Sequence, residues 1–332
     1  MYMDDIKFSL WCDFLERDFI NGEFLNLIQN STINGATSNP AIFKSAICSS
    51  NAYEEMKNDY KRKSPKELYE ILATSDIKNA ANKLLKNYAD GDDGFVSLEV
   101  DPNLYDDSEG TYKEGKRLFN TIKMPNVMIK VPATKAGFEA MSELMKKGIS
   151  VNATLIFNTS AVNECLEAFK QGSKAYSKRF PGAPLPKGVI SIFVSRFDRL
   201  LDSKLKEANL EASKYGIYNA TKAYKMIENA GLSNVRALFA STGVKGNKLE
   251  SDYYIKELLY PNVINTAPLD TIKAFIKADH TPKEILEDSV LDKFFVDAKN
   301  ADIDYDDTCK TLLDDGLKAF CDAFEEILKS LR

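Results

Sequence analysis

The sequence predicts an α/β protein whose parallel strands close into a (β/α)8 barrel of the TIM type. Eight short apolar runs, most of them rich in β-branched residues, alternate with segments of helical periodicity along the 332 residues. Such continuous apolar runs are typical of parallel strands that are buried on both faces. No G-x-G-x-x-G motif follows the first run, which disfavours an open doubly wound sheet, the main alternative. We expect one barrel domain over residues 1–332.

The strands follow one another at regular intervals. We expect them at residues 8–13, 33–38, 95–100, 127–132, 150–157, 189–194, 235–240 and 263–267. Between them the pattern predicts helices, one of which begins at the possible N-cap Ser64 with Pro65 in the first helical position. Another should begin at Ser160 and end at Gly172. The tail, residues 285–332, carries an apolar stripe at helical spacing and should form a C-terminal helix packed on the barrel.

Bulk composition excludes several classes of protein. The net charge of -5 and the dispersed Lys and Arg residues argue against a nucleic-acid partner. No run approaches the roughly 18 apolar residues that span a membrane, and the first residues lack an apolar leader, so we expect a cytoplasmic location. The five cysteines form no CxxC pair and are typical of core thiols. The single histidine, His280, disfavours catalytic triads and histidine-rich metal sites.

A lysine interrupts the most apolar of these strands, VMIKVP at 127–132. In a strand that is buried on both faces, an ammonium costs several kcal/mol unless it is neutralised or used. Burial favours the free amine, which a carbonyl substrate can trap as a Schiff base. The alternative is that Lys130 lies on an edge strand and extends its charge to water.

Other polar residues fall near the predicted strand ends. In a closed parallel barrel these ends meet at one mouth, where chemistry takes place. The groups expected there suit carbonyl chemistry on a phosphorylated polyol. They are one lysine, two carboxylates, two amides, hydroxyls and two further cations. Taken singly, Asn39 before Pro40 could be a turn residue and Arg196 a surface charge. The set comprises Asp13, Asn39, Glu99, Lys130, Asn152, Thr154, Ser191, Arg196, Ser241 and Lys245.

Two segments resemble the signature motifs of the transaldolase family. They are GATSNPAIF at 35–43 and IKVPATKAG at 129–137. The similarity continues in collinear order, from about Phe8 to Pro268, through the segments at 97–102, 152–157, 191–196 and 240–245. The resemblance implies a transaldolase of the non-oxidative pentose phosphate pathway. Such an enzyme passes dihydroxyacetone from a ketose phosphate to an aldose phosphate.

The resemblance also implies catalytic roles for four residues. Lys130 would form the Schiff base with the ketose donor. Asp13 would take the proton from the donor hydroxyl as the carbon–carbon bond breaks, and would return it to the acceptor. Glu99, working through a water held by Thr154, would move protons during imine formation and hydrolysis. No cofactor and no metal are implied.

The substrate-binding roles follow from the same resemblance. Asn39 and Asn152 would bind the dihydroxyacetone part, while Arg196 and Ser241 would bind the phosphate with Ser191 beside them. The sequence departs from the family at Gly243, a position where many relatives have an arginine.

We expect Lys245 to supply the second cation to the phosphate instead. The partners implied are small-molecule sugar phosphates, and a homodimer is one of the oligomeric states found in this family.

Two other functions remain open from the sequence. A related lysine-dependent aldolase would release dihydroxyacetone instead of transferring it. Such relatives tend to have a tyrosine at the position of Phe193 and no carboxylate at that of Glu99, so both residues favour transfer. A non-catalytic sugar-phosphate-binding barrel is the third reading. The complete set of Asp13, Glu99 and Lys130 disfavours it, since a pure binder has no need of a buried amine.

Overall fold

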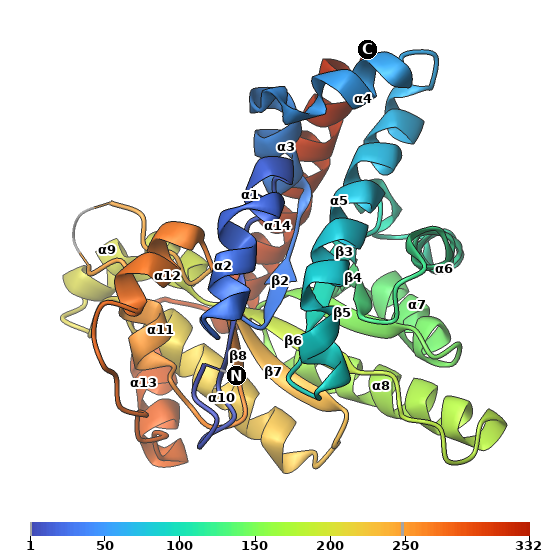
Figure 1. Cartoon of the computed structure of the whole chain (residues 1–332). Helices are drawn as coiled ribbons and strands as arrows, with labels where there is room; N and C mark the ends of the chain where they lie inside the picture. The colour runs from blue at the N-terminus through green and yellow to red at the C-terminus, as the bar shows by residue number, and fades with distance from the viewer. Residues whose placement is uncertain (1, 247–248) are drawn as a thin grey trace.

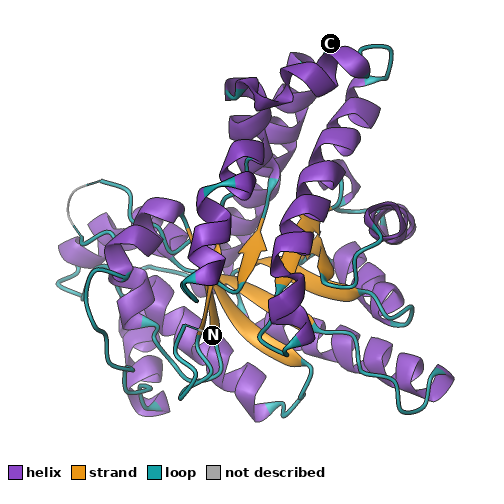
Figure 2. Ribbon diagram, viewed as in Figure 1, coloured by secondary structure: helices purple, strands orange, loops and turns teal. Residues whose placement is uncertain are grey.

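Eight parallel strands close into a barrel in chain order, and the last strand pairs with the first. The computed structural model describes residues 2–246 and 249–332. Figure 2 shows the orange strands enclosed by purple helices, so the predicted (β/α)8 barrel is confirmed. The strands are β1 (Ser9–Cys12), β2 (Gly35–Thr37), β3 (Phe95–Glu99), β4 (Val127–Pro132), β5 (Ser150–Ile156), β6 (Gly188–Phe193), β7 (Val235–Ala240) and β8 (Ile264–Ala267).

Helices surround this barrel and extend above one side of it (Figure 1). Those before β5 are α1 (Arg17–Asn21), α2 (Glu23–Gln29), α3 (Pro40–Ser49), η1 (Asn51–Tyr53), α4 (Glu54–Asp59), α5 (Pro65–Ala89), η2 (Pro102–Leu104), α6 (Ser108–Ile122) and α7 (Lys135–Met145). Those after β5 are α8 (Thr159–Arg179), α9 (Ser195–Glu207), α10 (Tyr215–Asn229), α11 (Tyr253–Glu257), α12 (Leu269–Phe275), α13 (Asp288–Asn300) and α14 (Tyr305–Ser330).

Alternation along the strands divides the apolar core in two. In β4, Val127, Ile129 and Val131 belong to the large cluster that the strands share with the surrounding helices. Met128 belongs to a second cluster that also contains Trp11. The strand register places Glu99 beside Lys130 and Lys130 beside Asn152. Since paired residues of neighbouring parallel strands point to the same face, these three polar side chains share the inside of the barrel.

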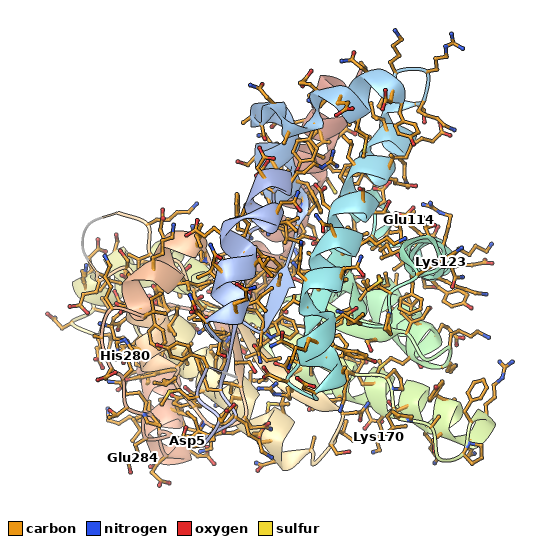
Figure 3. All side chains as sticks on the ribbon, viewed as in Figure 1. Asp5, Glu114, Lys123, Lys170, His280 and Glu284 are labelled. Carbon is orange, nitrogen blue, oxygen red and sulfur yellow. The ribbon has the colours of Figure 1, made fainter. Side chains whose placement is uncertain are left out.

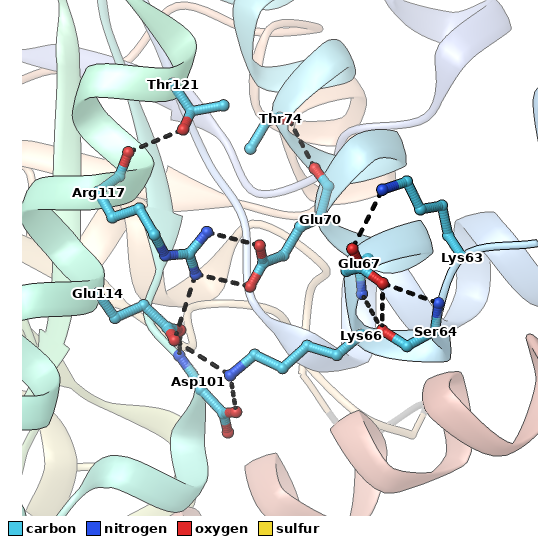
Figure 4. Close-up of polar contacts among 10 residues, drawn as sticks. All are labelled: Lys63, Ser64, Lys66, Glu67, Glu70, Thr74, Asp101, Glu114, Arg117 and Thr121. Atoms are coloured by element: carbon cyan, nitrogen blue, oxygen red, sulfur yellow. Dashed lines mark hydrogen bonds and ion pairs between the residues drawn. The ribbon is translucent and has the colours of Figure 1, made fainter. Parts of the chain in front are cut away.

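A network of charges ties α5 to α6 and to the segment after β3 (Figure 4). The predicted start of α5 is confirmed, since Ser64 and Glu67 form a reciprocal capping box. Lys66 contacts Asp101 at 2.5 Å and Glu114 at 3.1 Å. On the other side of the network, Arg117 of α6 donates two hydrogen bonds of 2.7 Å to Glu70 of α5. These pairs fix the loop that directly follows Glu99.

Two local expectations need correction. Asn158, not Ser160, caps α8, because its side-chain oxygen accepts from the Ala161 amide. The helix then continues through Gly172 to Arg179. Gly172 is there for packing, since a Cβ would lie 2.7 Å from the Met145 Cβ and 2.8 Å from the Ser142 carbonyl oxygen of α7.

The C-terminal tail forms two helices, and the long α14 packs on the barrel as predicted. In Figure 1 it runs beside α3, and its lower part reaches the mouth of the barrel. The ring of Phe324 packs edge-on against Tyr69 of α5, with 5.1 Å between centroids. Lys44 of α3 pairs with Glu326. Near the start of the helix, the Cys309 thiol donates to the Phe157 carbonyl.

The outer surface carries charges of both signs on many elements. Figure 3 labels Lys123, Lys170 and Glu284 on well-separated parts of the chain. His280 stacks on Phe275 with 4.2 Å between ring centroids, in the segment beyond the end of α12. Within residues 2–246 and 249–332, no helix is long and apolar enough to cross a membrane.

The contact between α7 and α8 yields a prediction in which packing opposes helix propensity. Gly172→Ala should destabilise the protein by about 1–3 kcal/mol through overpacking, although alanine is the better helix former by about 1 kcal/mol. Urea unfolding measures the change. Gln171→Ala, at the exposed neighbouring position, is the matched control and should have little effect. A more stable Gly172→Ala variant would show that the helices can separate without cost.

Candidate active site

Lys130 lies inside the barrel and is almost completely buried, with 4% of its surface exposed. Its ammonium donates to the Ser38 carbonyl at 3.0 Å, and its nitrogen lies 3.5 Å from a Glu99 carboxylate oxygen. The structure thus excludes the alternative of an edge-strand lysine that reaches water. A buried amine beside a carboxylate has the arrangement that imine chemistry requires.

Glu99 is a buried carboxyl whose pKa is shifted by its surroundings. Burial raises its pKa to about 7, while the nearby Lys130 charge acts in the opposite direction. Neither Glu99 oxygen has a hydrogen-bond partner among the described residues, and the same holds for the buried Thr154 hydroxyl. A carboxyl with a pKa near neutrality suits proton transfer in both directions.

Asp13 follows β1 and is oriented by two threonines. The Thr37 hydroxyl donates to the Asp13 carboxylate at 2.6 Å. A second bond of 2.6 Å joins the hydroxyls of Thr37 and Thr266. Because Thr37 has one proton and gives it to Asp13, Thr266 is the donor in this second bond. Burial raises the pKa of Asp13, and both Lys130 and the Thr37 bond oppose that rise.

Asn152 is held at both ends of its amide group. Its nitrogen donates to the Ser97 hydroxyl at 3.0 Å, and its oxygen accepts from the Ser191 hydroxyl at 2.6 Å. These partners come from β3 and β6, on either side of β4 and β5 in the barrel. Ser191 therefore orients Asn152, whereas the sequence placed it beside the phosphate group.

Thr154 lies two residues further along β5, directly before an irregularity. Leu155 has a φ of 59°, and the pairing with β6 shifts register between Ala153 and Ile156. Such a bulge ends regular pairing and redirects the chain at the barrel rim. The apolar sequence of this strand gave no indication of it.

Asn39 caps α3, because its side-chain oxygen accepts from the Ile42 amide at 3.0 Å. The turn reading of this residue and the substrate-binding reading are compatible. The cap uses the oxygen, so a bond to a ligand would come from the amide nitrogen. Asn39 and Asp13 are both partly exposed at the mouth, unlike Lys130.

The phosphate-binding candidates gather at the start of α9. The Arg196 guanidinium stacks on the Phe193 ring, 4.9 Å from its centroid. Burial, followed by the neighbouring positive charge of Arg199, lowers the pKa of Arg196. The Ser241 hydroxyl hydrogen-bonds that of Ser195 at 3.1 Å. Ser241 has a φ of 56°, so its strand ends here and the chain turns.

Two cations were expected near this group, and their placement differs. Arg196 is partly buried, as a ligand-binding cation at the mouth would be. Lys245 is exposed, four residues after Ser241. Arg199, one turn after Arg196, is a second positive charge that the sequence reasoning missed.

The C-terminal helix contributes to the site as well. The ring centroid of Phe320 lies 5.8 Å from the Lys130 nitrogen. One turn earlier, a Cβ on Gly316 would lie 2.9 Å from Leu155 and 3.1 Å from an Arg196 nitrogen. Sequence analysis read this helix as packing only. The hydroxyls of Thr37 and Ser97 were also missed, although Thr37 lies two residues before Asn39 and Ser97 two residues before Glu99.

Comparison with known proteins agrees with this geometry. The family model of transaldolase/fructose-6-phosphate aldolase matches residues 10–331, including the C-terminal tail. The transaldolase of Campylobacter jejuni strain 81-176 is 49% identical over 330 residues, which cover 98% of this chain and 99% of that protein. The transaldolase of Helicobacter pylori strain HPAG1 is 46% identical over 271 residues, 81% of this chain and 82% of that protein. The chain belongs to the transaldolase/fructose-6-phosphate aldolase family.

Proposed function

We propose that this protein is a transaldolase that works through a Schiff base on Lys130. The donor is a ketose phosphate, sedoheptulose 7-phosphate or fructose 6-phosphate. The acceptor is an aldose phosphate, glyceraldehyde 3-phosphate or erythrose 4-phosphate. The single observation that carries the proposal is the buried Lys130 nitrogen, which lies 3.5 Å from Glu99 inside a closed barrel.

The Lys130 amine attacks the ketose carbonyl, and loss of water gives a protonated imine. This imine at C2 is an electron sink, so cleavage of the C3–C4 bond, between the α and β carbons, leaves a neutral enamine and not a free carbanion. Asp13 takes the hydroxyl proton during cleavage and returns it when the acceptor aldehyde is attacked. The raised pKa of Asp13 favours such a proton carrier.

Glu99 and Thr154 serve the formation and hydrolysis of the imine. Both have buried oxygen atoms without a hydrogen-bond partner in the described part of the chain, which suits a shared water molecule between them. Asn152, held by Ser97 and Ser191, is oriented in advance to bind the dihydroxyacetone hydroxyls. Arg196 and Ser241 then hold the phosphate, with Arg199 or Lys245 as a second cation.

A dihydroxyacetone-releasing aldolase is the second candidate, because the family name covers both activities. Transfer is favoured by Phe193 and Glu99, and by the relatives named transaldolase. A non-catalytic sugar-phosphate binder would not need the pairing of Lys130 with Glu99. We further propose that the protein acts in the cytoplasm on free sugar phosphates, without nucleic acid or membrane, and that a homodimer is its form in solution.

The direct test is intact mass after borohydride reduction with fructose 6-phosphate, followed by peptide mapping. A reduced dihydroxyacetone adduct on the peptide that contains Lys130 is the expected result. Addition of erythrose 4-phosphate before reduction should remove the adduct and yield the transferred product. A folded protein that gains no mass would favour the non-catalytic binder.

Lys130→Met should abolish turnover while the protein stays folded. Methionine keeps a similar volume and removes a buried charge, so little stability should be lost. Activity and borohydride trapping measure the effect. The matched control is Lys135→Met, which changes the exposed second lysine of the same signature and should leave both readouts intact. Activity of Lys130→Met within about tenfold of the unchanged enzyme would disprove the Schiff-base assignment.

Arg196→Ala should mainly raise KM for phosphorylated substrates. Loss of one charge-assisted contact is worth about 1.5–3 kcal/mol, so KM should rise about tenfold to a hundredfold. Steady-state kinetics with fructose 6-phosphate and with unphosphorylated dihydroxyacetone separate the effects. Arg179→Ala, on the surface at the end of α8, is the control. Equal losses for both donors would count against a phosphate role.

Glu99→Gln should change how stability depends on pH. Burial raises the Glu99 pKa from 4.5 to about 7 in the folded chain. Between these values the folded chain holds a proton that the unfolded chain lacks, so the free energy of unfolding falls as pH rises. Urea unfolding should find this fall, on the order of 3 kcal/mol, in the unchanged protein and not in Glu99→Gln. The exposed Glu139→Gln control should keep it, and identical slopes in all three proteins would refute the prediction.

A further inference from the structure

The mouth of the barrel is covered on one side only. Lys130, Glu99 and Thr154 have at most 5% of their surface exposed, whereas Asp13, Asn39, Arg196 and Ser241 are partly exposed. The covered residues come from β3, β4 and β5. The open ones come from the segments after β1, β2, β6 and β7. The reactive nitrogen therefore lies at the closed end of a half-open site.

The cover over this closed end is α14. In Figure 1 the lower part of this helix reaches the strands, and it has contacts with β5, α9 and α3. Gly316 allows the close approach, because any side chain there would meet Leu155 and Arg196. Further up, Phe324 against Tyr69 and Lys44 against Glu326 anchor the helix away from the lysine. Phe320, which is 5% exposed, is the aromatic side chain of α14 recorded against Lys130.

The position of the Phe320 ring matters because a reactive enamine forms on the neighbouring Lys130. After carbon–carbon cleavage, a neutral enamine remains on Lys130 and must wait for the acceptor aldehyde. If water reaches it, a proton adds to the nucleophilic carbon and gives the protonated imine of dihydroxyacetone. Water then adds to the imine carbon, the carbon–nitrogen bond breaks, and dihydroxyacetone leaves the free amine. The sequence consumes one water molecule, involves no oxidation, and turns transfer into release.

We propose that Phe320 makes this enzyme a transferase by keeping water from the enamine. The ring centroid lies 5.8 Å from the Lys130 nitrogen, and the ring belongs to the apolar cluster that also contains Leu155 and Phe193, so it places apolar surface beside the reactive nitrogen. Phe320 is thus a specificity-determining residue for the fate of dihydroxyacetone. This inference rests on the proposed function.

The test compares release with transfer in Phe320→Ala, Phe320→Val and the control Phe324→Ala. Phe324 lies one turn later on α14, is similarly buried and packs on Tyr69 instead of Lys130. With fructose 6-phosphate alone, the unchanged enzyme should give a burst of one glyceraldehyde 3-phosphate per site and then a slow phase, which reports release. Erythrose 4-phosphate added in a parallel assay reports transfer.

We expect Phe320→Ala to raise the ratio of release to transfer at least about tenfold, with the burst retained. Phe320→Val, which removes less volume, should raise the ratio in the same direction, and it decides the question if the alanine variant does not fold. Phe324→Ala should leave the ratio unchanged. The inference is overturned if the Phe320 variants keep the wild-type ratio within about twofold, or if Phe324→Ala raises it equally. Absence of any burst in the unchanged enzyme would instead refute the proposed function.

Discussion

The structure depends on the burial of one ammonium group inside a closed parallel barrel. Lys130 can be there only because its surroundings offset the loss of water, through the Ser38 carbonyl, the Glu99 carboxyl and the face of Phe320. The same burial raises the Glu99 pKa to about 7, so one arrangement supplies both the amine and its proton-transfer partner.

Uncharged hydroxyls orient the remaining reactive groups. Thr266 and Thr37 hold Asp13, while Ser97 and Ser191 hold the two ends of the Asn152 amide. These hydroxyls orient the Asp13 and Asn152 side chains by hydrogen bonds and add no charge to the site. The charges near the reaction are therefore those of the carboxylates and the lysine. Each of these bonds joins different strands, and the positions of the strands in the closed barrel therefore set the geometry of the site.

The C-terminal helix completes the site from outside the barrel. It packs along α3 and α5 at one end and reaches Lys130 and Arg196 at the other. Its contacts link the covered half of the mouth to the open half, where the phosphate candidates lie. The family match extends over this tail.

The sequence by itself determined the order of the eight strands and the set of polar residues at the strand ends, but it left open whether Lys130 is buried or reaches water from an edge strand. Continuous apolar runs and helical spacing are local patterns. The run around Lys130 and the helix start at Ser64 can each be recognised from a few neighbouring residues. Only the tertiary structure decided that Ser191 orients Asn152, that Leu155 breaks the register of β5, that Gly172 serves helix packing, and that Phe320 covers the lysine. The physical reason is sequence distance: these contacts join segments far apart in the chain, so no local pattern records them.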